Sequence, residues 1–363
     1  MFIKDISIGL AQIPLIKPFK TALRTVNTLE CILVKITTKS GLVGYGETAP
    51  TKAITGDTKE SIVEVINFLK PYIIGQNILD FNHILATLHN SIEFNFSAKS
   101  ALEIALYDIF SQANKLPLFR HLGGSKKFFK TNNTISLNPT DIMIKDSLEA
   151  IEHGFTSLKI KLGQDYKEDI DRVLKIHKAI GDDISLKLDA NQGWNPQDSV
   201  SFLNTIESKN IKIDLIEQPV QRYDIEGLRY IKDKTSIPLM ADESVFSPKD
   251  AITILEAGAV DIINIKLDKC GGISKALQIA DICEIYATPC MIGCMLEGAI
   301  SVGAAAHVAS ARSGIITMYD LDSPMLCQSS PVEGGANFDA PIVELSEDFG
   351  LGIKGVNGVI WTD

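Results

Sequence analysis

The chain has 363 residues, of which 45% are hydrophobic and 22% are charged, a composition typical of folded globular proteins. This length exceeds one ordinary domain and predicts either two domains or one large barrel. The 45 acidic and 35 basic residues give a formal net charge of −10, so nucleic acids and anionic membrane surfaces are excluded as favourable partners.

The cysteines and the first residues indicate the compartment. Six cysteines are too few for a disulfide scaffold, and Cys290 and Cys294 lack the nearby histidines that a zinc site would need. The first twenty residues contain Asp5 and two prolines, unlike a secretion signal, and no run of about 18 apolar residues is present to cross a membrane. We therefore expect a cytoplasmic protein with reduced thiols.

The first third of the chain predicts an α+β domain. Residues 1–50 alternate apolar and polar side chains, and Ser40-Gly41 provides a turn between two antiparallel strands. From Thr58 to Leu122 the apolar spacing becomes helical, most clearly in SAKSALEIALYDIFSQANKL. We assign this domain to residues 1–125.

The next part of the chain alternates short apolar runs with amphipathic helical stretches. The eight runs are NTISL, SLKIKL, ISLKLDA, IDLIEQP, PLMADE, DIINIKL, TPCMIG and GIITMYD. The polar residues that end five successive runs are 28, 28, 25 and 24 positions apart, namely Lys161, Asp189, Glu217, Asp242 and Lys266. A period of about 25 accommodates one strand, one helix and two loops.

Eight such units predict a (β/α)8-type barrel over residues 126–331. A doubly wound open sheet is the alternative, but no strand is followed by a GxGxxG motif. The alternation stops after Pro331, and we expect residues 332–363 to return to the N-terminal domain and complete it.

Three acidic residues indicate a metal site. Asp189, Glu217 and Asp242 each follow an apolar strand and begin a loop, so in a barrel they meet at one rim. Each alone would equally fit an ordinary loop or helix-capping carboxylate. Three converging carboxylates repel one another unless a cation holds them, and such hard oxygen donors favour Mg²⁺ or Mn²⁺ over zinc.

Lysines occupy the same predicted rim. Lys159 and Lys161 lie two positions apart on one strand, so both side chains leave the same face. A solvated edge strand would show the same spacing. Lys266 ends a strand four places further round the barrel, across from Lys161. Two ammonium groups on either side of a metal site are suited to proton transfer on both faces of one substrate.

Together the motifs KIK, LDANQGW, IEQP, ADES and NIKLDKCGGI resemble those of the enolase superfamily, specifically its muconate lactonizing enzyme subgroup. The resemblance covers nearly the whole chain and implies a barrel with an N-terminal capping domain, in a homo-oligomer that binds one Mg²⁺ per subunit. It implies that Asp189, Glu217 and Asp242 bind this ion. Lys161 and Lys266 are then the acid/base catalysts of an enediolate reaction.

The same resemblance gives roles to residues around the metal. It implies that Lys159 neutralises the charge of a carboxylate substrate. Asn191 and Glu243 are implied to support the metal ligands from outside the coordination sphere.

Further residues resemble those of one branch, the dipeptide epimerases, which are isomerases. Asp320 and Asp322 in MYDLDSP match the pair that receives the free ammonium group of a dipeptide, for which two carboxylates are a fitting receptor. Arg24 in PFKTALRTVNT matches the position that meets the glutamate side chain in Ala-Glu epimerases. Glu297 in CMLEG is a further expected substrate contact. The resemblance thus implies interconversion of L-Ala-L-Glu and L-Ala-D-Glu.

Two alternatives remain open from the sequence. One is a lyase of the same superfamily, either an o-succinylbenzoate synthase or a cycloisomerase, although Asp320 and Asp322 would repel such polyanionic substrates. The other is a barrel that binds an acidic ligand without catalysis, which the intact set of lysines and acids disfavours.

Overall fold

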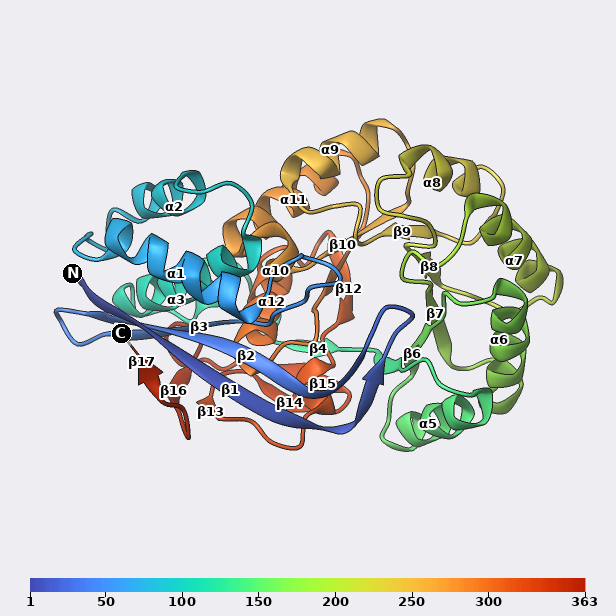
Figure 1. Cartoon of the computed structure of the whole chain (residues 1–363), viewed down its shortest axis with the longest axis horizontal. Coiled ribbons are helices and arrows are strands. Elements are labelled where there is room, and N and C mark those ends of the chain that lie inside the picture. Colours follow the sequence, from blue (N-terminus) through green and yellow to red (C-terminus); the bar gives the residue numbers. More distant parts are fainter. Residues whose placement is uncertain (363) are drawn as a thin grey trace.

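An antiparallel sheet forms one end of the molecule in the computed structural model, which describes residues 1–362 (Figure 1). Its strands, in spatial order, are β17 (Trp361–Thr362), β1 (Ile3–Lys20), β2 (Thr25–Thr38) and β3 (Val43–Thr48). The expected turn at Ser40-Gly41 joins β2 to β3, with Gly41 at a φ of +91° that favours glycine.

Four helices complete the capping domain and confirm the helical interpretation of this region. They are α1 (Lys59–Ile73), α2 (Phe81–Asn90), α3 (Phe96–Ala113) and α4 (Leu118–His121). Helix α3 packs against β3 so closely that a Cβ at Gly46 would lie 1.8 Å from the carbonyl oxygen of Ala101. Glycine in β3 is therefore what permits this contact.

Eight parallel strands form the nearly closed barrel, and each lies within one of the eight predicted runs (Figure 1). The strands are β5 (Asn133–Ile135), β6 (Ser157–Lys161), β7 (Ser185–Asp189), β8 (Leu215–Glu217), β9 (Leu239–Ala241), β10 (Ile262–Ile265), β11 (Cys290–Gly293) and β12 (Ile316–Asp320). They neighbour one another in chain order, which confirms the predicted barrel.

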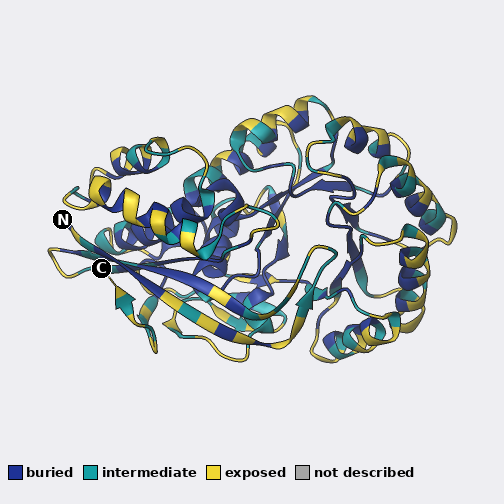
Figure 2. Cartoon of the chain, in the orientation of Figure 1, coloured by how far each residue is buried: buried dark blue, intermediate teal, exposed yellow. Residues whose placement is uncertain are grey.

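Helices surround the barrel, and most of them bury an inner face and expose an outer face (Figure 2), whereas Leu267–Cys270 and Ala299–Ala311 are buried almost all round. They are α5 (Thr140–Glu152), α6 (Tyr166–Ile180), α7 (Pro196–Ser208), α8 (Ile225–Lys232), α9 (Pro248–Glu256), α10 (Leu267–Cys270), α11 (Ile273–Ile285) and α12 (Ala299–Ala311). Among the helices of residues 1–362, none has both the length and the apolar character needed to cross a bilayer.

The segment after the barrel runs back toward the capping domain. A short 3₁₀ helix (Ser323–Leu326) is followed by β13 (Val332–Gly334), β14 (Asn337–Asp339), β15 (Ile342–Glu344) and β16 (Ile353–Val356). Strand β15 pairs with β4 (Phe128–Lys130), and β17 pairs with β1. The C-terminal residues therefore contact the N-terminal sheet, while the domain boundaries at 125 and 331 stay predictions.

A buried glutamate of the capping domain caps a barrel helix. Helix α12 begins after Gly298, which has no side chain to satisfy the free N–H groups of the first turn. Instead Glu47 of β3 accepts hydrogen bonds from the N–H groups of Ile300 at 2.9 Å and Ser301 at 3.2 Å. A negative charge is favoured at this helix end, because the helix dipole is positive there.

The capping domain also caps the adjacent barrel helix α11 with a carboxylate. In addition, a carboxylate of the barrel accepts hydrogen bonds from the capping domain. Glu103 of α3 accepts a hydrogen bond from the N–H of Ser274 at 2.5 Å, at a helix that begins after Gly272. In return Asp268 of α10 accepts hydrogen bonds from the Thr48 hydroxyl and the Ala49 N–H, at 2.9 and 3.2 Å. Carboxylates thus fix the capping domain against the barrel from both sides.

The capping contact explains Gly298 and gives a test. A Cβ at this position would lie 2.0 Å from Oε1 of Glu47, whose carboxylate is held by the helix and cannot move aside cheaply. We predict that Gly298→Ala lowers the free energy of unfolding by about 1–3 kcal/mol. Gly314→Ala is the control, since a Cβ there meets no atom within 4 Å. Equal stability of the two variants in urea denaturation would contradict the interdomain cap.

Candidate active site

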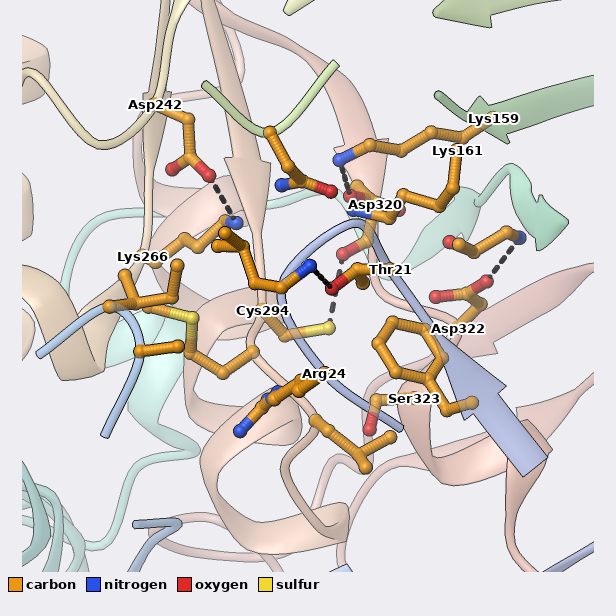
Figure 3. Close-up of a pocket in the computed structure, with 18 of the residues that line it drawn as sticks. Thr21, Arg24, Lys159, Lys161, Asp242, Lys266, Cys294, Asp320, Asp322 and Ser323 are labelled. Atoms are coloured by element: carbon orange, nitrogen blue, oxygen red, sulfur yellow. Dashed lines mark hydrogen bonds and ion pairs between the residues drawn. The ribbon is translucent and has the colours of Figure 1, made fainter. Parts of the chain in front are cut away.

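The predicted residues meet in a pocket at the C-terminal ends of the barrel strands, beneath the β1–β2 turn (Figure 3). Asp189 and Glu217 do not line it but are fully buried and contact lysines that do, namely Lys159 and Lys161. The predicted residues that line it are Arg24, Lys159, Lys161, Asn191, Asp242, Glu243, Lys266, Asp320 and Asp322.

Strand register places the first group of charges. Parallel pairing aligns Lys161 with Asp189 and Asp189 with Glu217, so these side chains enter the barrel in one row. Nζ of Lys161 lies 2.6 Å from Oδ2 of Asp189. Nζ of Lys159 lies 2.7 Å from Oε2 of Glu217, 2.8 Å from Oδ2 of Asp320 and 3.1 Å from Oδ2 of Asp189. One buried ammonium group therefore contacts three carboxylates.

A second group of charges lies across the pocket (Figure 3). Lys266 follows β10 directly, and its Nζ lies 2.7 Å from Oδ2 of Asp242. Nζ of Lys269 lies 2.7 Å from the other oxygen, Oδ1. Sequence reasoning missed Lys269, although its spacing from Lys266 places both on one side of a helical turn.

The buried acids of the site outnumber the buried lysines. When all of these groups are ionised, six carboxylates against four ammonium groups leave an excess of two negative charges. The groups are Asp189, Glu217, Asp242, Glu243, Asp320 and Asp322 against Lys159, Lys161, Lys266 and Lys269. Burial and the neighbouring Asp189 raise the pKa of Glu217 to about 7. Burial and the neighbouring Asp242 raise the pKa of Glu243 to about 8. The positive charge near these two carboxyl groups is thus too small to offset their burial and the repulsion from neighbouring carboxylates.

Other acids at the site are stabilised by direct contacts. Burial would raise the pKa of Asp320, but the ammonium group of Lys159 lowers it to about 2. Likewise, Lys266 and Lys269 outweigh burial and hold the pKa of Asp242 well below its usual range. These two carboxylates are therefore charged at neutral pH.

The donor set fits a hard divalent cation. Oδ1 of Asn191 and Oε2 of Glu243 are buried without a hydrogen-bond partner, and the excess of two negative charges equals the charge of one such ion. Within residues 1–362, however, no three acidic, histidine or cysteine side chains are arranged as a metal-binding group. Ammonium groups contact the carboxylates there, so ion binding requires them to move aside.

The amide of Asn191 and the carboxylate of Glu243 lie next to the predicted metal ligands. Nδ2 of Asn191 is 3.5 Å from Oε1 of Glu243. Asn264, which the sequence did not single out, donates a hydrogen bond from Nδ2 to Oε1 of Glu217 at 2.9 Å. These contacts orient carboxylates that would otherwise rotate freely.

Asp320 and Asp322 lie together at the end of β12, as their spacing predicts. Oδ1 of Asp320 accepts a hydrogen bond from Nδ2 of Asn132 at 2.6 Å, and Oδ2 of Asp322 accepts one from the N–H of Thr134, also at 2.6 Å. Burial and the charge of Asp320 raise the pKa of Asp322 to about 7. Within residues 1–362, Asp320 thus forms an ion pair with Lys159, whereas Asp322 forms none.

Arg24 lies in the turn between β1 and β2, where the N–H of Thr21 donates to the Arg24 carbonyl at 3.0 Å. Its half-buried guanidinium lines the pocket (Figure 3). Within residues 1–362 no carboxylate forms an ion pair with it. Burial lowers the pKa of Arg24. The group is thus a cation without a fixed partner at the pocket edge.

The structure does not bring Glu297, the further expected substrate contact, to the pocket, because its carboxylate is held by neighbouring residues. Oε1 accepts a hydrogen bond from the Met295 N–H at 2.5 Å, and Oε2 contacts the Ser301 hydroxyl. Met295 and Leu296 line the pocket instead. The sequence placed Glu297 correctly after β11 but could not show which way the loop turns.

Family comparisons agree with this architecture. Residues 6–123 match the N-terminal domain of mandelate racemase and muconate lactonizing enzyme, and residues 143–356 match the enolase C-terminal domain-like family. The chain therefore belongs to the mandelate racemase and muconate lactonizing enzyme family of the enolase superfamily.

Individual relatives are similar over almost their whole lengths. An L-Ala-D/L-Glu epimerase of Clostridium acetobutylicum is 49% identical, over 98% of this chain and 100% of the relative. A hydrophobic dipeptide epimerase of Enterococcus faecalis is 41% identical, over 98% of this chain and 100% of the relative. The solved structure of a substrate-liganded L-Ala-D/L-Glu epimerase from Bacillus subtilis superposes with a TM-score of 0.96 at 41% identity, over 98% of this chain and 99% of that one.

The charge balance of the site predicts the effect of removing one lysine. Lys159→Met keeps the side-chain volume roughly constant but leaves three buried carboxylates without their shared cation. We predict a loss of about 3–5 kcal/mol in the free energy of unfolding without added metal. Lys145→Met on the exposed face of α5 is the control. Thermal denaturation that shows the same loss for both variants, or for neither, would contradict the charge balance.

Proposed function

We propose that this chain is a Mg²⁺-dependent dipeptide epimerase that interconverts L-Ala-L-Glu and L-Ala-D-Glu. The observation that carries the proposal is that Lys161 and Lys266 occupy opposite sides of a pocket that also contains the Asp320 and Asp322 pair (Figure 3). Relatives with this activity in their names, and a relative crystallised with Mg and the dipeptide L-Leu-L-Tyr, support it.

Asp189, Glu217 and Asp242 are the residues that would hold the ion, with Mn²⁺ as an alternative to Mg²⁺. When bound, the cation stabilises the negative charge that a substrate carboxylate gains when the adjacent α-carbon loses its proton. Lys159 adds a fixed positive charge beside the same carboxylate. Asn191 and Glu243 would keep the ligands oriented.

Two lysines can invert the α-carbon of the C-terminal residue. One accepts the α-proton on one face as a neutral amine, and the other donates a proton to the opposite face as an ammonium group. Burial alone would lower the pKa of Lys266, but the charge of Asp242 raises it above its usual range. Lys266 therefore holds a proton that it can donate. In the reverse reaction the two lysines exchange these roles.

The remaining charges orient the dipeptide. Asp320 and Asp322 would bind its α-ammonium group, which offers three hydrogen-bond donors. Arg24, a guanidinium without an ion-pair partner within residues 1–362, would bind the glutamate side chain through two parallel hydrogen bonds. A lyase of the same superfamily is less well supported, because this acidic pair would repel polyanionic substrates.

Other features are proposed from the family resemblance. We propose a homo-oligomeric cytoplasmic enzyme. We also propose a capping domain of residues 1–125, a catalytic barrel of residues 126–331 and a C-terminal segment of residues 332–363 that completes the cap. The pairing of β17 with β1 supports the last division.

Isotope exchange tests the two-lysine arrangement. Incubation of L-Ala-L-Glu with the enzyme and MgCl₂ in ²H₂O is predicted to give both epimers with deuterium at the C-terminal α-carbon. Lys266→Ala is predicted to lower the rate of inversion by at least about 10²–10⁴-fold, since a positioned acid or base contributes about that much. Mass spectrometry and chiral chromatography measure the two quantities. Inversion without deuterium incorporation, or full activity of Lys266→Ala, would contradict the mechanism.

Substrate preference tests Arg24. Arg24→Met removes the charge-assisted hydrogen bonds to a glutamate side chain, worth about 1.5–3 kcal/mol. We predict that kcat/KM for L-Ala-L-Glu falls about 10–100-fold, while that for L-Ala-L-Leu is unchanged within about twofold. Equal losses for both dipeptides would show that Arg24 has only a structural effect. No loss for either would show that glutamate binds elsewhere.

A further inference from the structure

Lys269 is a buried charge to which the mechanism above gives no task. It lies in α10, three residues after Lys266, and its side chain is fully buried. A buried lysine is rare unless its ammonium group is paired. Here Nζ contacts three oxygens: Oδ1 of Asp242 at 2.7 Å, the carbonyl oxygen of Asn264 at 3.0 Å, and the carbonyl oxygen of Asp242.

These contacts join two barrel strands where their pairing ends. The ladder between β9 and β10 pairs Met240 with Ile262 and Ala241 with Ile263. The next pair along would be Asp242 and Asn264, and the Lys269 ammonium bridges the carbonyl oxygens of those two residues. The lysine therefore fixes the backbone at the point where Asp242 leaves the barrel.

The side-chain contact also fixes the orientation of the Asp242 carboxylate. Of the two oxygens of the Asp242 carboxylate, Lys269 contacts Oδ1 and Lys266 contacts Oδ2. With one oxygen held from behind, the carboxylate cannot rotate freely about its terminal bond. Oδ2 faces Lys266, which lines the pocket, so it is the oxygen that a ligand there can share once the Lys266 ammonium group moves aside.

We propose that Lys269 is a positioning residue that holds the Asp242 carboxylate with Oδ2 directed toward bound Mg²⁺. This inference rests on the proposed function, because it takes Asp242 as a metal ligand. Groups that orient a metal ligand from outside the coordination sphere commonly change metal affinity by about 10–100-fold when they are removed.

A purely electrostatic effect would have the opposite sign. An ammonium group close to the ion repels it, so removal of that charge alone would strengthen Mg²⁺ binding. Loss of a positioning contact weakens binding instead, because the free carboxylate must be ordered when the ion binds. The sign of the change therefore separates the two effects.

Isothermal titration calorimetry with MgCl₂ alone provides the test, in the absence of any dipeptide. We expect Lys269→Met to raise the Mg²⁺ dissociation constant about 10–100-fold. Lys187→Met is the matched control: Lys187 is a buried lysine of β7, but its Nζ contacts the Ser157 hydroxyl and not a predicted ligand. We expect this variant to bind Mg²⁺ within about threefold of the unsubstituted chain. Lys269→Gln gives the same test if the methionine variant does not fold.

Three outcomes would overturn the inference. They are unchanged affinity of the Lys269 variants, tighter binding by them, and an equal loss in Lys187→Met. Each can occur while the unsubstituted chain binds Mg²⁺ and epimerises dipeptides, in which case the proposed function stands. If the unsubstituted chain binds no Mg²⁺, the proposed function fails first and the inference fails with it.

Discussion

The site depends on an excess of negative charge that is buried at the mouth of the barrel. Carboxylates at the ends of β7 and β8, just after β9 and at the end of β12 are brought together because parallel register aligns the strand ends. Lysines from β6 and from the loop after β10 contact these acids but do not balance them. Such an arrangement is costly unless a cationic ligand enters. Dipeptide epimerases of Enterococcus faecalis and Cytophaga hutchinsonii, which are similar to this chain, have been crystallised with Mg and a dipeptide, ligands of the kind that would offset this charge.

The capping domain is fixed to the barrel by buried carboxylates. Glu47 and Glu103 cap the barrel helices α12 and α11, and Asp268 holds the chain after β3. The loop that follows β3 then supplies Ala53 and Ile54 to the pocket wall. Contacts between the domains thus determine the position of one wall of the pocket, and the glycines at the starts of both helices leave room for the capping carboxylates.

Most of the fold and the main charges of the site could be predicted from the sequence. Each barrel strand is an apolar run, and its last polar residue projects at the rim, so spacing alone located Lys161, Asp189 and Glu217. The directions of side chains in the loops that follow the strands could not be predicted from this spacing. Glu297 follows β11 closely, but the loop turns its carboxylate to Ser301 and away from the pocket. The roles of Gly298 and Glu47 also stayed hidden, because their contact joins residues 251 positions apart in the sequence.

A crystal structure with Mg²⁺ and L-Ala-L-Glu would show whether the two lysines lie on opposite faces of a metal-bound substrate. We predict that the ion binds Asp189, Glu217 and Asp242 and that the substrate α-carbon lies between Nζ of Lys161 and Nζ of Lys266, one on each face. The ammonium group of the dipeptide would contact Asp320 and Asp322. Both lysines on one face of the α-carbon, or an ion bound away from the three acids, would contradict this prediction.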